Sequence, residues 1–325
     1  MNRHRLAVLA VAATGLAVPI SISSVHSNAQ TSAAAASRTV DGQRDVQGVW
    51  NFSTITALER PAEFAGKATM TAEDAAAFEK RTMERSDRDR RDPNPAVDVG
   101  SAYNEFWWDR GTTVATVRGE KRTSLIVDPP DGRIPPLTAA GQQRAAARAE
   151  ARRQHPADGP EDRSLGERCL MFNAGPPMLP GPYNNYVQIF QTRSDVVINN
   201  EMIHDARIVP LDGRPHPPGA VRRWQGDSRG RWEGNTLVVD TTNFTDATNF
   251  RGASDKLHLV ERFTRVDADT LLYEFTVDDP SSFTRPWTAA LPMKKTDDRI
   301  FEYACHEANY AMVGILRGAR FEEKK

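Results

Sequence analysis

The chain has 325 residues and a formal net charge of −1, with 26% charged and 39% hydrophobic residues. This balance is typical of a globular protein with a sizeable core, and it excludes disorder along the whole chain. It also excludes a general polyanion-binding surface, so we expect no nucleic-acid partner.

The first 29 residues differ from the rest and indicate a signal peptide. Arg3 and Arg5 precede an apolar run from Leu6 to Ile22, and Ser27–Ala29 supplies the small residues that a signal peptidase reads. The alternative, a membrane anchor, needs a longer and less polar stretch to span about 30 Å of hydrocarbon. We therefore expect a periplasmic or secreted protein without stable membrane insertion after cleavage.

The cysteine content fits such a compartment. The chain contains two cysteines, Cys169 and Cys305. In an oxidising environment an even pair favours a disulfide bridge, although two separate buried thiols remain the alternative.

The first half of the mature chain predicts a helical excursion. Residues 30–46 are small and polar and read as a linker, and the single β-rich domain expected at 47–325 starts with a strand at Gly48–Phe52. Within an excursion at 66–155, one helix is expected after Thr71, which acidic residues follow, and another after Thr138, which precedes an Ala- and Arg-rich run.

Between and after these helices the sequence predicts a strand and a loop. Thr123–Asp128 is a short apolar strand that ends in a turn at Pro129–Gly132. Residues 156–182 are rich in Gly and Pro, so we expect an extended covering loop there.

From Tyr186 onward, short β-branched and aromatic runs follow one another, separated by turn residues. The runs are YVQIF, DVVI, ARIVPL, NTLVVDTTNF, LHLVERFTRV, TLLYEFTV and RIFEYAC, the last at 299–305. No long helical pattern lies between them, so the connections must be hairpins. The fold class is therefore mainly β, an antiparallel meander forming a barrel or a strongly curved sheet, with a helical insertion.

Residues Gly226–Gly230 match G-x-S-x-G, the pattern of a hydrolase nucleophile elbow. An elbow needs a helix directly after the serine, whereas Thr236–Thr242 reads as a strand. We therefore predict that GDSRG is a turn, that Ser228 is not a nucleophile, and that Glu233–Asn235 makes a tight hairpin connection.

The densest polar cluster of the β region contains a candidate acid–base site. His204 can serve as the base with Asp205 or Asp227 to orient it, because imidazole titrates near neutral pH, and Arg207 or Arg231 can hold an anionic group. The alternative is a structural histidine among surface ion pairs.

A metal site is not predicted. The spacings of His204, His216 and His306 match no known ligand framework, and Glu201 diverges from His204 if the segment is a strand. We expect neither metal nor cofactor.

Several residues are candidates for ligand binding. Glu261 shares a strand face with apolar neighbours, so its carboxylate is buried and either pairs with an arginine across the sheet or lines a pocket. Trp224 and Trp232 can line a pocket or fill the core, and His216 and His306 join them as candidate ligand-binding residues.

Six segments together resemble a large group of exported bacterial proteins known from genomes as hypothetical proteins. They are LIVDPPDGRIPPLT, ERCLMFNAGPPMLPGPYNN, HDARIVPLDGRPH, WQGDSRGRWEGNTLVVDTTNF, LVERFTRVDADTLLYEFTVDDP and FEYACHEANY. The likeness covers most of 46–320 and implies export but no activity. Gly48–Trp50 also resembles the G-x-W of lipocalin-type barrels, from which the excursion at 66–155 departs.

Two function classes follow from these observations. The first is a periplasmic protein that binds a small apolar, aromatic or sugar-like ligand at a barrel mouth or sheet face. The alternative is a hydrolase or lyase that uses the His/Asp/Arg acid–base site. A structural envelope module with a broad apolar patch is a third class, and the oligomeric state is open.

Overall fold

The computed structural model describes residues 38–101, 104–172, 175–204, 206–307 and 309–324. These residues belong to one unit, Ala34–Lys325. The expected signal peptide at 1–29, and the expected linker as far as residue 37, lie outside the described residues. Val46, near the end of that linker, is fully buried, so the core begins before the first strand.

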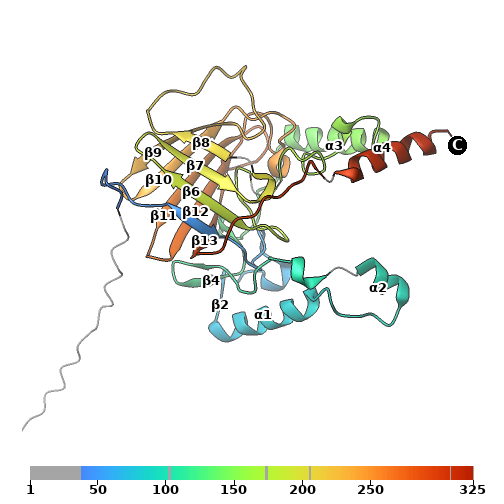
Figure 1. Cartoon of the computed structure of the whole chain (residues 1–325), viewed down its shortest axis with the longest axis horizontal. Helices are drawn as coiled ribbons and strands as arrows, with labels where there is room; N and C mark the ends of the chain where they lie inside the picture. Colours follow the sequence, from blue (N-terminus) through green and yellow to red (C-terminus); the bar gives the residue numbers. More distant parts are fainter. Residues whose placement is uncertain (1–37, 102–103, 173–174, 205, 308, 325) are drawn as a thin grey trace, which may run out of the picture. The chain divides into compact units, whose positions relative to one another are not determined.

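A large antiparallel sheet dominates the described chain (Figure 1). Its strands are β1 (Gly48–Asn51), β5 (Ile126–Asp128), β6 (Tyr186–Gln191), β7 (Asp195–Asn200), β8 (Ala206–Pro210), β9 (Asp227–Glu233), β10 (Thr236–Thr242), β11 (His258–Arg265), β12 (Thr270–Asp278) and β13 (Trp287–Thr296). Their order is β8-β7-β6-β1-β13-β12-β11-β10-β9, with β5 also paired to β13. The first strand thus joins two meanders, β6–β8 and β9–β13.

Strict alternation of side chains gives this sheet one apolar face. In β11, Leu259, Glu261 and Phe263 are buried while the residues between them are partly exposed. The same face carries fully buried Trp50 and Trp287, and burial of such large side chains stabilises the fold by roughly 25 cal/mol per Å². The predicted antiparallel, mainly β class is confirmed.

The sheet is not closed into a barrel. Within the described strands, β8 and β9 are the two ends of the hydrogen-bonded path. They nevertheless lie against each other, because a Cβ placed on Gly230 of β9 would come within 2.9 Å of Val209 Cγ1 on β8. The two edges meet through side-chain packing.

The remaining elements cluster in the helical excursion and at the C-terminal end. A small sheet has the order β2-β4-β3, formed by β2 (Thr69–Met70), β3 (Thr116–Val117) and β4 (Glu120–Arg122). The α-helices are α1 (Ala72–Ser86), α2 (Pro95–Ser101), α3 (Ala139–Gln154) and α4 (Tyr310–Glu322). Short 3-10 helices are η1 (Ala62–Phe64), η2 (Glu105–Trp107), η3 (Pro160–Asp162), η4 (Met202–His204) and η5 (Phe250–Gly252).

The two helices expected from their first-turn signals are confirmed. The Thr71 hydroxyl accepts a hydrogen bond from the Asp74 amide at the start of α1, and the Thr138 hydroxyl does the same for the Gly141 amide at α3. No described helix is both long and apolar enough to cross a bilayer.

Two expectations about elements are corrected. The strand expected at Thr123–Asp128 is limited to β5, where only Ile126–Asp128 pairs with β13. The strand expected at 299–305 is wrong, because none of these residues is in a strand. Both sides of the preceding strand, β13, are already occupied by β12 and β1, and the Phe301 amide donates to the Glu201 carboxylate instead. The strand β13 and the helix α4 were not expected at all.

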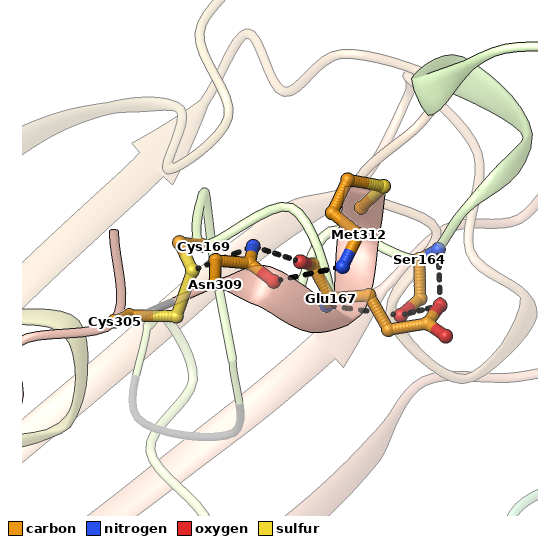
Figure 2. The surroundings of a disulfide bond; sticks show 6 residues. All are labelled: Ser164, Glu167, Cys169, Cys305, Asn309 and Met312. Atoms are coloured by element: carbon orange, nitrogen blue, oxygen red, sulfur yellow. Dashed lines mark hydrogen bonds between the residues drawn. A yellow bond between two sulfur atoms is a disulfide. The ribbon is translucent and has the colours of Figure 1, made fainter. Parts of the chain in front are cut away.

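A disulfide between Cys169 and Cys305 confirms the predicted bridge, with a Cα–Cα distance of 5.7 Å. Figure 2 shows how it joins the start of α4 to the loop before β6: the Asn309 side-chain amide donates to the Glu167 carbonyl at 2.8 Å and to Cys169 Sγ at 3.4 Å. The Asn309 carbonyl oxygen also caps α4 by accepting from the Met312 amide. The bridge and the cap therefore fix α4 at one point.

Candidate functional site

A pocket of about 550 Å³ lies where the two edges of the large sheet meet. We call it the edge pocket; β8, the end of the 211–226 loop and the start of β9 form its wall. Its charged and aromatic lining residues are Arg207, Arg214, Arg223, Trp224, Asp227 and Arg229. Three of the predicted site residues, Arg207, Trp224 and Asp227, therefore converge on one place.

The chain enters β9 through a turn that only glycine fits. Gly226 has φ +69°, and a Cβ there would lie 2.5 Å from the Thr242 carbonyl oxygen. Ser228 follows within β9, and its hydroxyl shares a 2.9 Å hydrogen bond with the Thr241 hydroxyl. The prediction that GDSRG is a turn is thus wrong beyond Gly226, since Asp227–Glu233 is a strand.

The chain after Ser228 continues as a hairpin, so the serine is not followed by the helix that a nucleophile elbow needs. Glu233 pairs with Thr236, so Gly234 and Asn235 form the two-residue connection expected there. A strand rather than a helix follows the serine, and its hydroxyl faces a threonine. Ser228 has the partners of a structural residue.

Beneath the edge pocket, Arg207 and Glu261 form a buried ion pair. The Arg207 guanidinium donates to both carboxylate oxygens of Glu261, with 2.9 Å between Nη2 and Oε1, and the Tyr273 hydroxyl donates to Oε1 at 2.7 Å. Glu261 is 0% exposed and Arg207 6%. Of the two alternatives for the buried Glu261, the structure shows the pairing with an arginine, and Glu261 is not among the residues that line the edge pocket.

The electrostatics of this pair follow from its burial. Burial alone would lower the pKa of Arg207, but the Glu261 carboxylate outweighs it and the pKa is raised. Burial, and then the negative charge of Glu261, raise the pKa of Tyr273 well above its ordinary value. Both shifts favour a charged Arg207 and a protonated Tyr273 that donates its hydrogen bond.

On the opposite face of the sheet, a chain of ion pairs pins the 211–226 loop. His216 Nδ1 lies 2.8 Å from Asp227 Oδ2, and His216 Nε2 lies 3.0 Å from Asp240 Oδ1. The second oxygen of Asp240 lies 2.8 Å from His258 Nε2. The hydrogen bond from His258 lowers the pKa of Asp240, and the same bond raises the pKa of His258.

This arrangement defines the role of Asp227. One of its oxygens faces His216, and Arg229 reaches the same oxygen with Nε at 3.2 Å. Both ring nitrogens of His216 face carboxylates, so His216 anchors the loop and offers no free base to the pocket. The predicted Asp227 is thus in the site, but its described histidine partner is His216.

The other predicted site residues lie apart from the edge pocket or are not fully described by the structure. His204 ends η4, and the placement of its side chain is not described; Asp205 lies outside the described residues. Arg231 is exposed and pairs with Glu233 at 2.7 Å. Trp232 packs against the main core, and His306 is exposed in the turn after Cys305.

No family model, curated protein or solved structure matches this chain. Within the described part of the chain, no group of three or more His, Cys, Asp or Glu side chains could hold a metal ion.

Sequence reasoning missed three arginines of the edge pocket. Arg214 and Arg223 come from the 211–226 loop, and Arg229 lies on β9 two positions after Asp227. The available signal was their density, because the stretch from 207 to 231 is rich in arginine. Periodicity could not reveal Arg214 and Arg223, since loop residues have no strand face, and Arg229 lies in the stretch that was predicted to be a turn.

Two larger cavities carry weaker chemical signals. One of about 650 Å³ is bordered by α3, by the loop that contains Cys169 and by residues 247–250. At its border Arg163 pairs with Glu167, and Arg148 bonds to Asn249. Its charged groups are largely used in holding the loops together.

The other cavity, of about 960 Å³, is walled mainly by threonines, glycines and surface lysines. Burial raises the pKa of Asp109 at its border, although amide donors of Asn185 oppose the shift. Burial, followed by the nearby charges of Asp109 and Asp298, raises the pKa of Tyr186 to about 12. The Asp109 carboxylate accepts from the Asn185 backbone amide at 3.4 Å, and the Tyr186 hydroxyl donates to Asp298 at 3.2 Å. The edge pocket therefore remains the better candidate.

Proposed function

We propose that the protein is exported and binds a small molecule in the edge pocket. The observation that carries the proposal is the convergence there of a half-buried tryptophan, Trp224, with charged groups on a wall fixed by the buried Arg207–Glu261 pair. Ligand sites are concave and combine apolar surface with a few polar groups held in place. The disulfide supports export, because such bridges persist in oxidising compartments.

The proposal takes the large sheet to be strongly curved, with the pocket at the line where its edges meet. Arg207 on the edge strand β8 reaches Glu261 on β11, and in sheet order five strands lie between them. In a flat sheet neighbouring strands lie about 4.8 Å apart, so β8 and β11 would be separated by far more than the length of a hydrogen bond.

A hydrolase or lyase has less support. The oxygens of Asp227 face His216 and Arg229, and the Ser228 hydroxyl faces Thr241. A general base must reach the proton that it removes, and the Asp227 carboxylate and the Ser228 hydroxyl are already engaged in holding the fold.

The test is whether filling the edge pocket abolishes binding. Ala206 is an exposed pocket residue, so Ala206→Trp should block the site without disturbing the core. Native mass spectrometry of the purified protein should detect a bound small molecule in the wild type and in the control Ala311→Trp, which alters an exposed position of α4, and not in Ala206→Trp. A ligand retained equally by Ala206→Trp would place binding elsewhere, and no ligand in any sample together with no hit in a fragment screen would refute a binding function.

A further inference from the structure

The charges of the edge pocket balance except at one residue. Arg207 is matched by Glu261, and Arg229 by Asp227 at 3.2 Å. The same is true of Arg214, whose Nε lies 2.6 Å from the carboxylate of Asp212.

Arg223 differs from these three arginines. It lines the edge pocket and is exposed, and among the described residues its guanidinium has no hydrogen-bond or ion-pair partner. Its neighbour Arg222, by contrast, bonds to Asp255. A guanidinium presents several N–H donors in a planar fork that matches a carboxylate. One cation in this pocket is thus free to take an anion.

Apart from the buried Arg207, the β8 side of the pocket is apolar. Ala206, Ile208 and Pro210 belong to the pocket wall, and Ile208 is 62% exposed, unusual for a β-branched side chain in a strand. Trp224 adds a half-buried aromatic ring, with the Arg168 guanidinium 5.9 Å from its centroid. A ligand that covers Ile208 and Trp224 would remove this apolar surface from water.

We infer that the edge pocket binds a small monocarboxylate with an apolar or aromatic body, its carboxylate on Arg223 and its body against Ile208 and Trp224. This inference rests on the proposed binding function and names its ligand class. A neutral sugar would leave Arg223 unmatched. A phosphate dianion would bring two charges to a pocket with one unmatched cation, and the excess charge would lie close to Asp227.

The test compares acids with their neutral amides. Benzoate and hexanoate, paired with benzamide and hexanamide, are titrated into the wild-type protein at pH 7, with binding followed by ligand-observed NMR and calorimetry. The acids should bind at least tenfold more tightly than the amides, because only the acids can form a charge-assisted pair with the Arg223 guanidinium. High salt should narrow this difference.

Two variants test whether Arg223 causes the preference for acids over amides. Arg223→Gln, at an exposed position, should lower the affinity for each acid to within about twofold of the affinity for its amide. The affinities for the amides should not change. Arg231→Gln, an exposed arginine of β9 outside the edge pocket, should keep the wild-type preference.

The outcomes separate this inference from the proposed function. Equal binding of acids and amides, an acid preference that survives Arg223→Gln, or tighter binding of phenyl phosphate than of benzoate would overturn the carboxylate assignment and leave the binding function standing. Binding of none of the probes, with no ligand seen by native mass spectrometry, would overturn both.

Discussion

Arg207 and Glu261 meet on the apolar face of the large sheet, where the arginine donates to both oxygens of the carboxylate. The two residues are 54 positions apart in sequence and lie on β8 and β11. Because the carboxylate is wholly removed from water, its charge is compensated by this arginine and by the Tyr273 hydroxyl alone among the described residues. The pair ties one edge of the sheet to strands near the other edge.

Breaking this pair on one side should be strongly destabilising. Glu261→Leu leaves the buried Arg207 guanidinium uncompensated and should lower the free energy of unfolding by about 3–5 kcal/mol. The double variant Arg207→Met/Glu261→Leu carries no orphaned charge and should be more stable than Glu261→Leu alone. Urea denaturation measures both, with Glu274→Gln as a control on the Arg118–Glu274 pair, whose arginine is exposed and where a loss of about 1 kcal/mol or less is expected. Strictly additive losses in the double variant would contradict the coupling.

The burial of Glu261 could be predicted from sequence, but its partner could not. Alternation along β11 places Glu261 on the face of Leu259 and Phe263, and that face is buried. Which arginine meets it depends on the arrangement of many strands together, which the alternation within one strand does not encode. The edge pocket has the same origin, since it is formed by a loop and two strand edges that are not neighbours in the sheet.

Two elements that the sequence did not predict, β13 and α4, contain residues that weaken the local signal. Pro292 lies within β13, and a proline normally argues against a central strand because it cannot donate to the ladder. Here β5 pairs with Thr288 and Ala289, and β1 with Lys294–Thr296, so Pro292 falls between the two partners on that side. The helix α4 contains Gly314, which weakens a helical signal. By contrast, threonine caps and composition were enough to predict α1 and α3.

The contact between the sheet edges makes Gly230 sensitive to any side chain. A Cβ there would lie 2.6 Å from Leu211 Cδ2 and 2.9 Å from Val209 Cγ1. Gly230→Ala should therefore cost about 1–3 kcal/mol of stability through overpacking. Gly314→Ala, which meets nothing within 4 Å in α4, should be neutral or stabilising by up to about 1 kcal/mol. Equal urea midpoints for wild type and Gly230→Ala would show that β8 and β9 do not pack as described.

Acid should weaken the fold partly through Asp279. Burial alone would raise the pKa of this carboxyl, but hydrogen bonds from Ser282, Ser254 and Ser281 lower it to about 2. Since the folded pKa lies below the ordinary value of 3.8, the stabilisation is complete above that value and is lost as the pH falls towards 2. The loss should amount to roughly 2 kcal/mol.

Unfolding free energies measured between pH 2 and pH 7 check this point. Asp279→Asn should be less stable than wild type at pH 7 by about 2 kcal/mol, and the difference should shrink towards pH 2. Asp278→Asn, one residue earlier, leaves the three serines and their carboxylate in place and should follow the wild-type curve. A pH-independent difference between Asp279→Asn and wild type would assign the effect to packing instead.

The disulfide should contribute to stability chiefly by restraining the unfolded chain. Cys169 and Cys305 are 136 positions apart, and closing so long a loop is worth about 5 kcal/mol in the chain-entropy model. Native contacts also hold α4, because Arg320 donates to the Asp158 carbonyl at 2.7 Å and to the Ala157 carbonyl at 3.0 Å. The double variant Cys169→Ala/Cys305→Ala should thus fold but lose about 2–5 kcal/mol, and its α4 amides should exchange hydrogen faster than those of the sheet. Dithiothreitol should bring the wild type to the stability of the variant and leave the variant unchanged, whereas a wild type that keeps its urea midpoint after complete reduction would show that the bridge restrains nothing the fold needs.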